Sequence, residues 1–473
     1  MINNNLVYNL QQLTTKQWRL FLEFVESPYF NKHQKLIILA KHLHTCSPKW
    51  HEKDLDRQVV FNKCFPNQTY DLQKIKNIFS KLQKQLREFI SIYHFQRNKE
   101  WKQSTLVQGS FDLNMPQLWK EQNQKYKQDY TPSYHAYELL EIEKKLILKQ
   151  GDRKNTQAVV EDQISWLEDF FWKERFRLAI EHISLINVLN LEIKNQNWAL
   201  LNHLPDKLLQ NKTINRYRLT FEMLKLEYPQ SKAAFLGLLD SIKENDFSNC
   251  STEESHAFYV YAVNYCTARA NSGIAGYYEY LFEIYELMDI HGRLIQNGTL
   301  SQGTFLNIVG TASNLGKFDW ATAFIQKYRS YLPIDKQENA IVYNLSLLCF
   351  YKKEYDEALK QLHKVTFTDP HYALTARILE IRIFYAQQEW LVLDALFERL
   401  RIYLLRDKEL PKQRKLESQN FLKLTRVLTN LAQGGCYKKP LEIKIKQLLE
   451  KIDNSKWLMH RSWLKTMGNK LYY

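Results

Sequence analysis

Four potential metal ligands lie close together in the segment KHLHTCSPKWH, namely His42, His44, Cys46 and His51. A structural Zn²⁺ needs four nitrogen or sulfur ligands that converge on one point. Residues two apart on a helix point to different faces, so His42 and His44 converge only where the helix has already ended. No second Cys/His pair follows at a finger-like spacing, since the next cysteine is Cys64. We therefore interpret the segment as a helix C-terminus, whose negative dipole favours histidine, and expect no metal.

Basic side chains are concentrated in residues 74–102, where eight lysines and arginines stand against two glutamates. Helical projection places Lys74, Lys81 and Lys84 opposite the apolar face, where they could contact phosphates. Any amphipathic surface helix shows the same arrangement, and no recognisable helix-turn-helix follows. The net charge of +15 is spread along a chain with 66 basic and 51 acidic residues. A nucleic-acid-associated regulatory protein is therefore the alternative hypothesis for function.

Motifs of common enzymes are missing from the sequence. It contains no G-x-x-x-x-G-K-[ST], G-x-G-x-x-G or G-x-S-x-G string, so phosphate cradles and nucleophile elbows have no local support. We expect no enzymatic activity, no catalytic residues and no cofactor, although catalytic residues from distant parts of the chain stay an open alternative.

The composition predicts an all-α protein of the cytoplasm. Only 13 glycines and 11 prolines punctuate 473 residues, which is typical of long helices joined by short turns. The N-terminal segment lacks the basic start and apolar core of a secretory signal. No apolar run approaches the roughly 18 residues of a membrane span, so no membrane contact is expected. The six cysteines are scattered, and Cys266 and Cys349 are predicted to be buried.

The clearest repeat is the segment NAIVYNLSLLCFYKKEYDEALKQLHKVTFTDPHY, residues 339–372, which is 34 residues long. Ser346 in its first half and Ala358 in its second are small residues that let two helices approach closely. Leu362 and Val365 continue the apolar face at helical spacing. Because proline disfavours helix in the residue before it, Asp369-Pro370 is predicted to end the unit.

Two neighbouring segments repeat this order. Before it, the first helix presents Phe305, Ile308 and Ala312, a turn follows at Gly316, and the second helix presents Ala321, Ile325 and Tyr328. After it, the apolar positions are Leu379, Ile383, Leu393, Phe397 and Leu400, with Trp390 at the turn.

These segments resemble tetratricopeptide (TPR) repeats, whose period is 34 residues. The phrases SPYFNK and FPNQTYD in the first hundred residues add a resemblance to TPR proteins of the Bacteroidetes type. The resemblance implies an α-solenoid of antiparallel helix pairs with a small N-terminal helical domain and a C-terminal helical cap. The predicted divisions are an N-terminal helical domain in 1–100, degenerate helical repeats in 101–250, TPR-like repeats in 251–405 and capping helices in 406–473.

Periodicity also predicts the individual helices outside the clearest repeats. The strongest is residues 71–95, whose apolar stripe comprises Leu72, Ile75, Phe79, Leu82, Leu86, Phe89 and Tyr93. Further helices are predicted at 15–26, 32–44, 54–64, 133–150, 156–190, 198–210, 214–226, 232–243, 256–271, 277–288, 413–432, 441–452 and 456–465.

The resemblance implies a protein-interaction scaffold, because the first helix of each TPR pair lines a concave groove that binds a peptide or helical segment of a partner protein. TPR proteins that clamp a peptide carboxylate use several Lys, Asn and Arg residues, of which only Asn344 and Arg377 have compatible positions here. Leu347, Ile381 and Tyr351 have packing against neighbouring helices as an alternative role. The predicted partner-binding residues are Asn307, Tyr343, Asn344, Tyr351, Arg377 and Tyr385.

Overall fold

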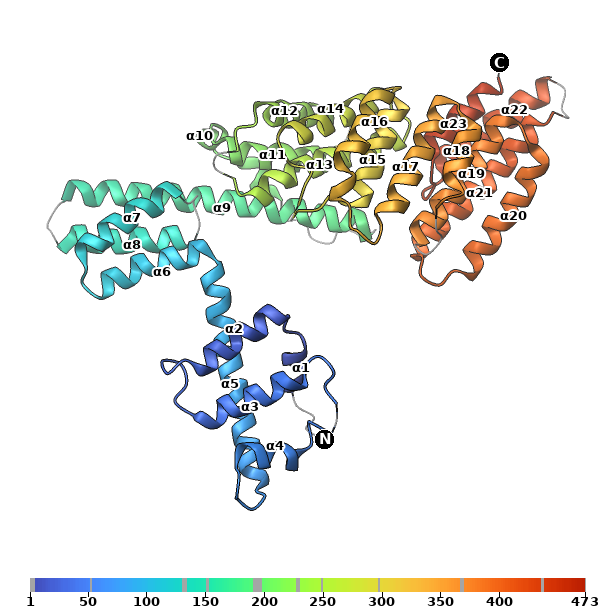
Figure 1. The fold of residues 1–473 in the computed structure, drawn as a ribbon. Coiled ribbons are helices and arrows are strands. Elements are labelled where there is room, and N and C mark those ends of the chain that lie inside the picture. Colours follow the sequence, from blue (N-terminus) through green and yellow to red (C-terminus); the bar gives the residue numbers. More distant parts are fainter. Residues whose placement is uncertain are drawn as a thin grey trace. The chain divides into compact units, whose positions relative to one another are not determined.

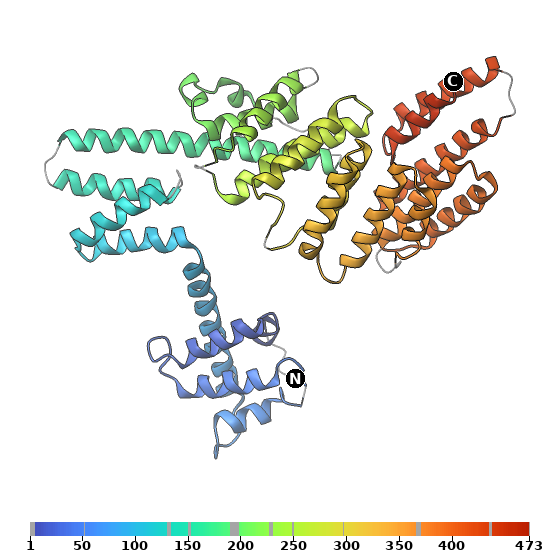
Figure 2. The same cartoon turned by 45° about the horizontal axis from the view of Figure 1, so that its top comes forward.

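The computed structural model shows an all-α chain with 23 α-helices in the residues that it describes. No β-strand occurs in this part of the chain, beyond an isolated bridge between Gln296 and Thr299. The chain divides into two compact units, Met1–Phe170 and Phe171–Tyr473, and is drawn in Figures 1 and 2. The described residues are 5–51, 53–129, 134–149, 153–189, 198–226, 230–247, 250–296, 298–365, 370–434 and 438–472.

The first part of unit 1 is a five-helix cluster with its own core. The predicted apolar stripe lies in this core from Ile75 to Phe89, whereas Leu72 at its start is exposed. Asp71 starts the long helix because its side chain accepts hydrogen bonds from two backbone N–H groups, those of Gln73 and Lys74. The helices are α1 (Asn5–Gln11), α2 (Thr15–Glu26), α3 (Gln34–Cys46), α4 (Arg57–Cys64) and α5 (Leu72–Arg97).

The second part of unit 1 contains two helices that the sequence did not predict, α6 (Lys99–Asp112) and α7 (Pro116–Asp129). Pro116 suits the first position of α7, where a missing N–H costs nothing. Val107 and Tyr126 of these helices are buried against α8 (Tyr134–Lys149). Both helices are short and contain few apolar residues, so hydrophobic periodicity did not predict them.

Unit 2 begins inside the long helix α9 (Arg153–Leu189), whose predicted stripe from Trp172 to Ile186 is buried. Residues 198–210 do not form the single predicted helix. Pro205 separates a 3₁₀ turn, η1 (Ala199–His203), from the short α10 (Asp206–Leu209), since proline disrupts a continuing helix.

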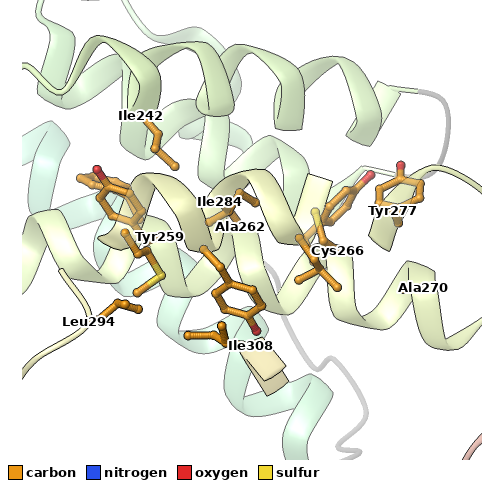
Figure 3. Packing of buried hydrophobic residues seen from close by; sticks show 14 of the residues in the cluster. Ile242, Tyr259, Ala262, Cys266, Ala270, Tyr277, Ile284, Leu294 and Ile308 are labelled. Carbon is orange, nitrogen blue, oxygen red and sulfur yellow. The ribbon is translucent and has the colours of Figure 1, made fainter. Parts of the chain in front are cut away.

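The rest of unit 2 is a series of helix pairs, each packed against the next (Figures 1 and 2). Pairing follows from short turns such as the two residues between α17 and α18. Figure 3 shows the core around Tyr259, Ala262 and Cys266, where large rings fill the space between neighbouring pairs. The pairs are α11 (Lys212–Lys225) with α12 (Gln230–Glu244), α13 (Thr252–Asn271) with α14 (Tyr277–Ile290), α15 (Gln302–Asn314) with α16 (Phe318–Tyr328), which η2 (Arg329–Tyr331) follows, α17 (Gln337–Lys352) with α18 (Tyr355–Leu362), and α19 (Pro370–Gln387) with α20 (Trp390–Arg406).

Three C-terminal helices complete unit 2: α21 (Lys412–Ala432), α22 (Lys438–Asn454) and α23 (Arg461–Lys470). The last of these starts five residues later than predicted. His460 precedes it with a left-handed backbone (φ +51°), which prevents the helix from extending towards Lys456.

The apolar positions predicted for the repeats lie at helix contacts. Phe305, Ile308 and Ala312 of α15 are fully buried, as is Ala358 of α18. The hydroxyl of Ser346 donates a 2.7 Å hydrogen bond to the backbone oxygen of Ala358, so α17 and α18 touch at the two predicted small residues. Asp369 lies outside the described residues, and Pro370 is the first residue of α19.

Replacing Ala358 by Trp should destabilise unit 2, because an indole has no space where α17 and α18 touch. Overpacking of a core typically costs about 1–3 kcal/mol. Urea unfolding followed by circular dichroism measures the loss, and Lys360→Trp, on the exposed side of α18, is the matched control. If Ala358→Trp unfolds at the same urea concentration as the control, the assigned helix contact is wrong.

Candidate binding groove

A groove of about 1020 Å³ runs along unit 2 and is lined by residues of successive helix pairs. One wall comes mainly from the first helices of four pairs, α13, α15, α17 and α19, with contributions from α14. Residues 458–471, which include α23, form the other wall. The ring centroids of Tyr385 and Trp463 are 5.4 Å apart across the groove, and α13 also contacts α23.

Four predicted partner-binding residues line this groove: Asn307, Tyr343, Tyr351 and Tyr385. The side chain of Asn307 is exposed, and that of Tyr351 is half-buried. Tyr343 and Tyr385 are largely buried, and burial raises the pKa of each phenol to about 12. The two buried tyrosines therefore present only a small part of each ring to the groove.

Asn344 and Arg377, the other two predicted residues, do not line the groove. Asn344 is fully buried, and its amide Nδ2 donates a 2.7 Å hydrogen bond to the backbone oxygen of Ala340, one turn earlier. The guanidinium of Arg377 lies 4.3 Å from the ring centre of Tyr403 and also hydrogen-bonds the oxygen of Ala373. The structure thus places neither side chain in the groove lining, because one residue of helical register decides which face of the helix a side chain joins.

Two of the residues for which helix packing was the alternative role, Leu347 and Ile381, are buried. Leu347 lines the groove and is also buried in the main core of unit 2, where it packs against neighbouring helices. Ile381 is fully buried in the separate core of α19 to α23 and does not line the groove.

Several groove residues were not predicted from the sequence. Arg382 of α19, Trp463 of α23 and His460 before α23 all line it. They come from segments some 80 residues apart along the chain, and no local spacing signals that they meet. Only the packing of the C-terminal helices against the pairs brings them together.

Arg382 is the buried cation of the groove, with 5% of its surface exposed. Its guanidinium carbon lies 4.6 Å from the ring centre of Phe350, 5.9 Å from that of Tyr351 and 5.6 Å from that of Trp463. Burial and the charges of Arg382 and Arg414 lower the pKa of His460 to about 3. His460 is therefore neutral near pH 7.

The basic residues of the alternative hypothesis lie on α5 in unit 1. Lys74, Lys81 and Lys84 are all exposed, as helical projection predicted. The Lys74 ammonium donates a hydrogen bond to the side chain of Gln68 at 3.0 Å. The three lysines thus share a solvent-facing helix surface.

The histidine-cysteine segment ends α3, as interpreted from the sequence. The Nε2 of His42 lies 2.9 Å from the backbone oxygen of Asp54, and its Nδ1 lies 3.0 Å from the Lys63 ammonium. His44 instead packs against the ring of Trp18. Among the described residues, no group of three His, Cys, Asp or Glu side chains is arranged to hold a metal ion.

The cysteines of the described residues are free thiols. Cys266 is fully buried as predicted, whereas Cys349 is only partly buried. Burial raises the pKa of the Cys64 thiol to about 11, which disfavours the reactive thiolate. Cys436 lies outside the described residues.

No protein-family model, curated protein or solved structure matches this chain. Its likeness to TPR proteins rests on the repeat residues alone. Within the described residues, no helix is long and apolar enough to cross a membrane.

The pKa of His460 predicts a pH dependence of stability. In the unfolded chain a histidine has a pKa of about 6.5. Below that pH, His460 is protonated in the unfolded chain but stays neutral in the folded protein. The free energy of unfolding should therefore fall by up to about 1.4 kcal/mol per pH unit as the pH drops from about 6.5 towards 3. Asparagine tolerates the left-handed backbone, so His460→Asn should remove this component. Urea unfolding at several pH values checks it, and equal pH dependence in both proteins would contradict the assignment.

Proposed function

We propose that unit 2 is a non-enzymatic, TPR-like scaffold whose groove binds a peptide or helical segment of a partner protein. The observation that carries this proposal is the lining of one groove by α13, α15, α17 and α19, the first helices of four consecutive pairs. In TPR arrays the first helices form the concave, ligand-binding side. A groove built in this way suits an elongated ligand that contacts several repeats.

The chemistry of the groove fits a polypeptide. Amide side chains at Asn307 and Asn314 can bond to a peptide backbone, and the rings of Tyr351 and Trp390 offer apolar contact. The opposite wall contains α23, whose Trp463 packs against Tyr385 of α19. The side chains of the groove thus already pack against one helix. Binding of an amphipathic helix in such a groove is a common mode of recognition.

The test uses exposed or half-buried groove residues, because replacing buried Tyr343 or Asn344 would also disturb the core. Combined alanine substitution of Asn307, Asn314 and Tyr351 should abolish recovery of a specific partner in a pull-down from the native cell. Loss of hot-spot contacts worth about 2 kcal/mol or more weakens binding roughly 30-fold. Mass spectrometry of the recovered proteins identifies the partner.

The matched control replaces three exposed residues on second helices, Gln326, Lys360 and Asp394, by alanine. This variant should recover the partner as the wild type does. Circular dichroism should show the same helix content in all three proteins. Equal recovery by the groove variant would refute the proposed binding surface.

Nucleic-acid binding by α5 is the second candidate, favoured by the shared exposed surface of Lys74, Lys81 and Lys84. If this function operates, changing the three lysines to Glu should abolish binding to nucleic acid while the groove variant binds normally. Affinity of the wild type should also fall steeply with salt, because bound phosphates release counterions. Filter binding at several salt concentrations measures both effects. We expect instead that partner recovery resists nuclease and does not depend on these lysines.

A further inference from the structure

Arg382 is a buried charge without a carboxylate partner among the described residues. Its Nε has no hydrogen-bond partner there, and no acidic side chain lies within ion-pair distance of its guanidinium. A buried charge without a counter-charge is costly, and native structures compensate it by pairing or by a bound ion. This arginine nevertheless lines a groove from which a ligand can reach it.

The rings around Arg382 compensate only part of this cost. Phe350, Tyr351 and Trp463 attract the cation through their ring faces. None of these rings accepts a hydrogen bond from the planar fork of a guanidinium in the way that a carboxylate does. The guanidinium is therefore held in place by its neighbours while its strongest type of partner is missing from the described residues.

The other charges of the groove also favour an anion. Within the described residues, the lining contains five basic side chains, those of Lys353, Arg382, Arg414, Arg461 and Lys470, and one acidic side chain, that of Glu417. Glu417 already pairs with Arg414 at 3.2 Å. The pKa of His460 is lowered mainly by burial, and the positive charges of Arg382 and Arg414 lower it further.

We propose that this groove binds a small organic anion with an aromatic or similarly apolar body. Its carboxylate pairs with the guanidinium of Arg382, and its body lies against the aromatic lining that includes Tyr385 and Trp390. The volume of about 1020 Å³ is at the upper end of small-molecule sites, which are mostly apolar with a few polar groups that fix orientation. The inference goes beyond partner binding and does not depend on it.

Isothermal titration of the full chain with naphthoate and with its neutral analogue naphthamide tests the proposal. The two probes have the same ring system and differ in charge. Naphthoate should bind about tenfold more tightly or better, as expected for a hydrogen-bonded charge pair. Equal affinity for the two probes, or no binding of naphthoate at millimolar concentration, would overturn the proposal.

Variants assign the effect to Arg382. Arg382→Met should bind naphthoate no better than naphthamide, while Arg426→Met, which removes a partly exposed arginine outside the groove, should keep the preference. The melting temperature without ligand gives a second readout. Because methionine removes a buried charge that the rings compensate only in part, Arg382→Met should melt at or above the wild-type temperature. A lower melting temperature would mean that the arginine serves the fold, and would count against the site.

The carboxylate that pairs with Arg382 could also belong to a polypeptide. Titration with a hexaglutamate peptide, at matched carboxylate concentration, distinguishes a peptide ligand from a small organic anion. Binding of naphthoate but not of the peptide supports the small-anion site. Binding of the peptide alone would overturn it and leave the partner-binding proposal standing, since the pull-down experiment does not depend on either probe.

Discussion

Close contact between paired helices is the constraint on which unit 2 depends. A helix pair cannot bury its apolar face alone, so each must pack against its neighbours. Ser346 and Ala358 show how this begins, because two small residues let α17 and α18 touch and their hydrogen bond satisfies the serine hydroxyl. Larger rings such as Tyr259 and Tyr285 then fill the space between pairs. The first helices are thereby aligned, and the groove follows from that alignment.

Much of the fold could be predicted from the sequence because periodicity is a local signal. Helix α2 begins and ends at the predicted residues, and the stripe of α5 is buried over most of its length. The polar helices α6 and α7 were not predicted, because they contain too few apolar residues to form a periodic pattern. Around Pro205, the predicted helix is interrupted, because the fixed φ and missing N–H of proline outweigh the apolar spacing.

The candidate site was predictable only in part. A helical wheel places Asn307 and Tyr351 near the groove, but it cannot decide whether Asn344 faces solvent or the core. That choice depends on packing between α17 and its neighbours. Arg382 and Trp463 lie far apart along the chain and come together only through tertiary packing. No local residue spacing indicates such a contact.

The wall contributed by residues 458–471 has a consequence for synthesis of the protein. A chain emerging from the ribosome exposes α13, α15, α17 and α19 before that wall exists. During this interval the ring of Tyr385 and the guanidinium of Arg382 are without their contacts to Trp463. Tyr385 and Arg382 therefore reach their final burial only after α23 has been synthesised. Until then the nascent chain exposes an aromatic and charged surface that chaperones can bind.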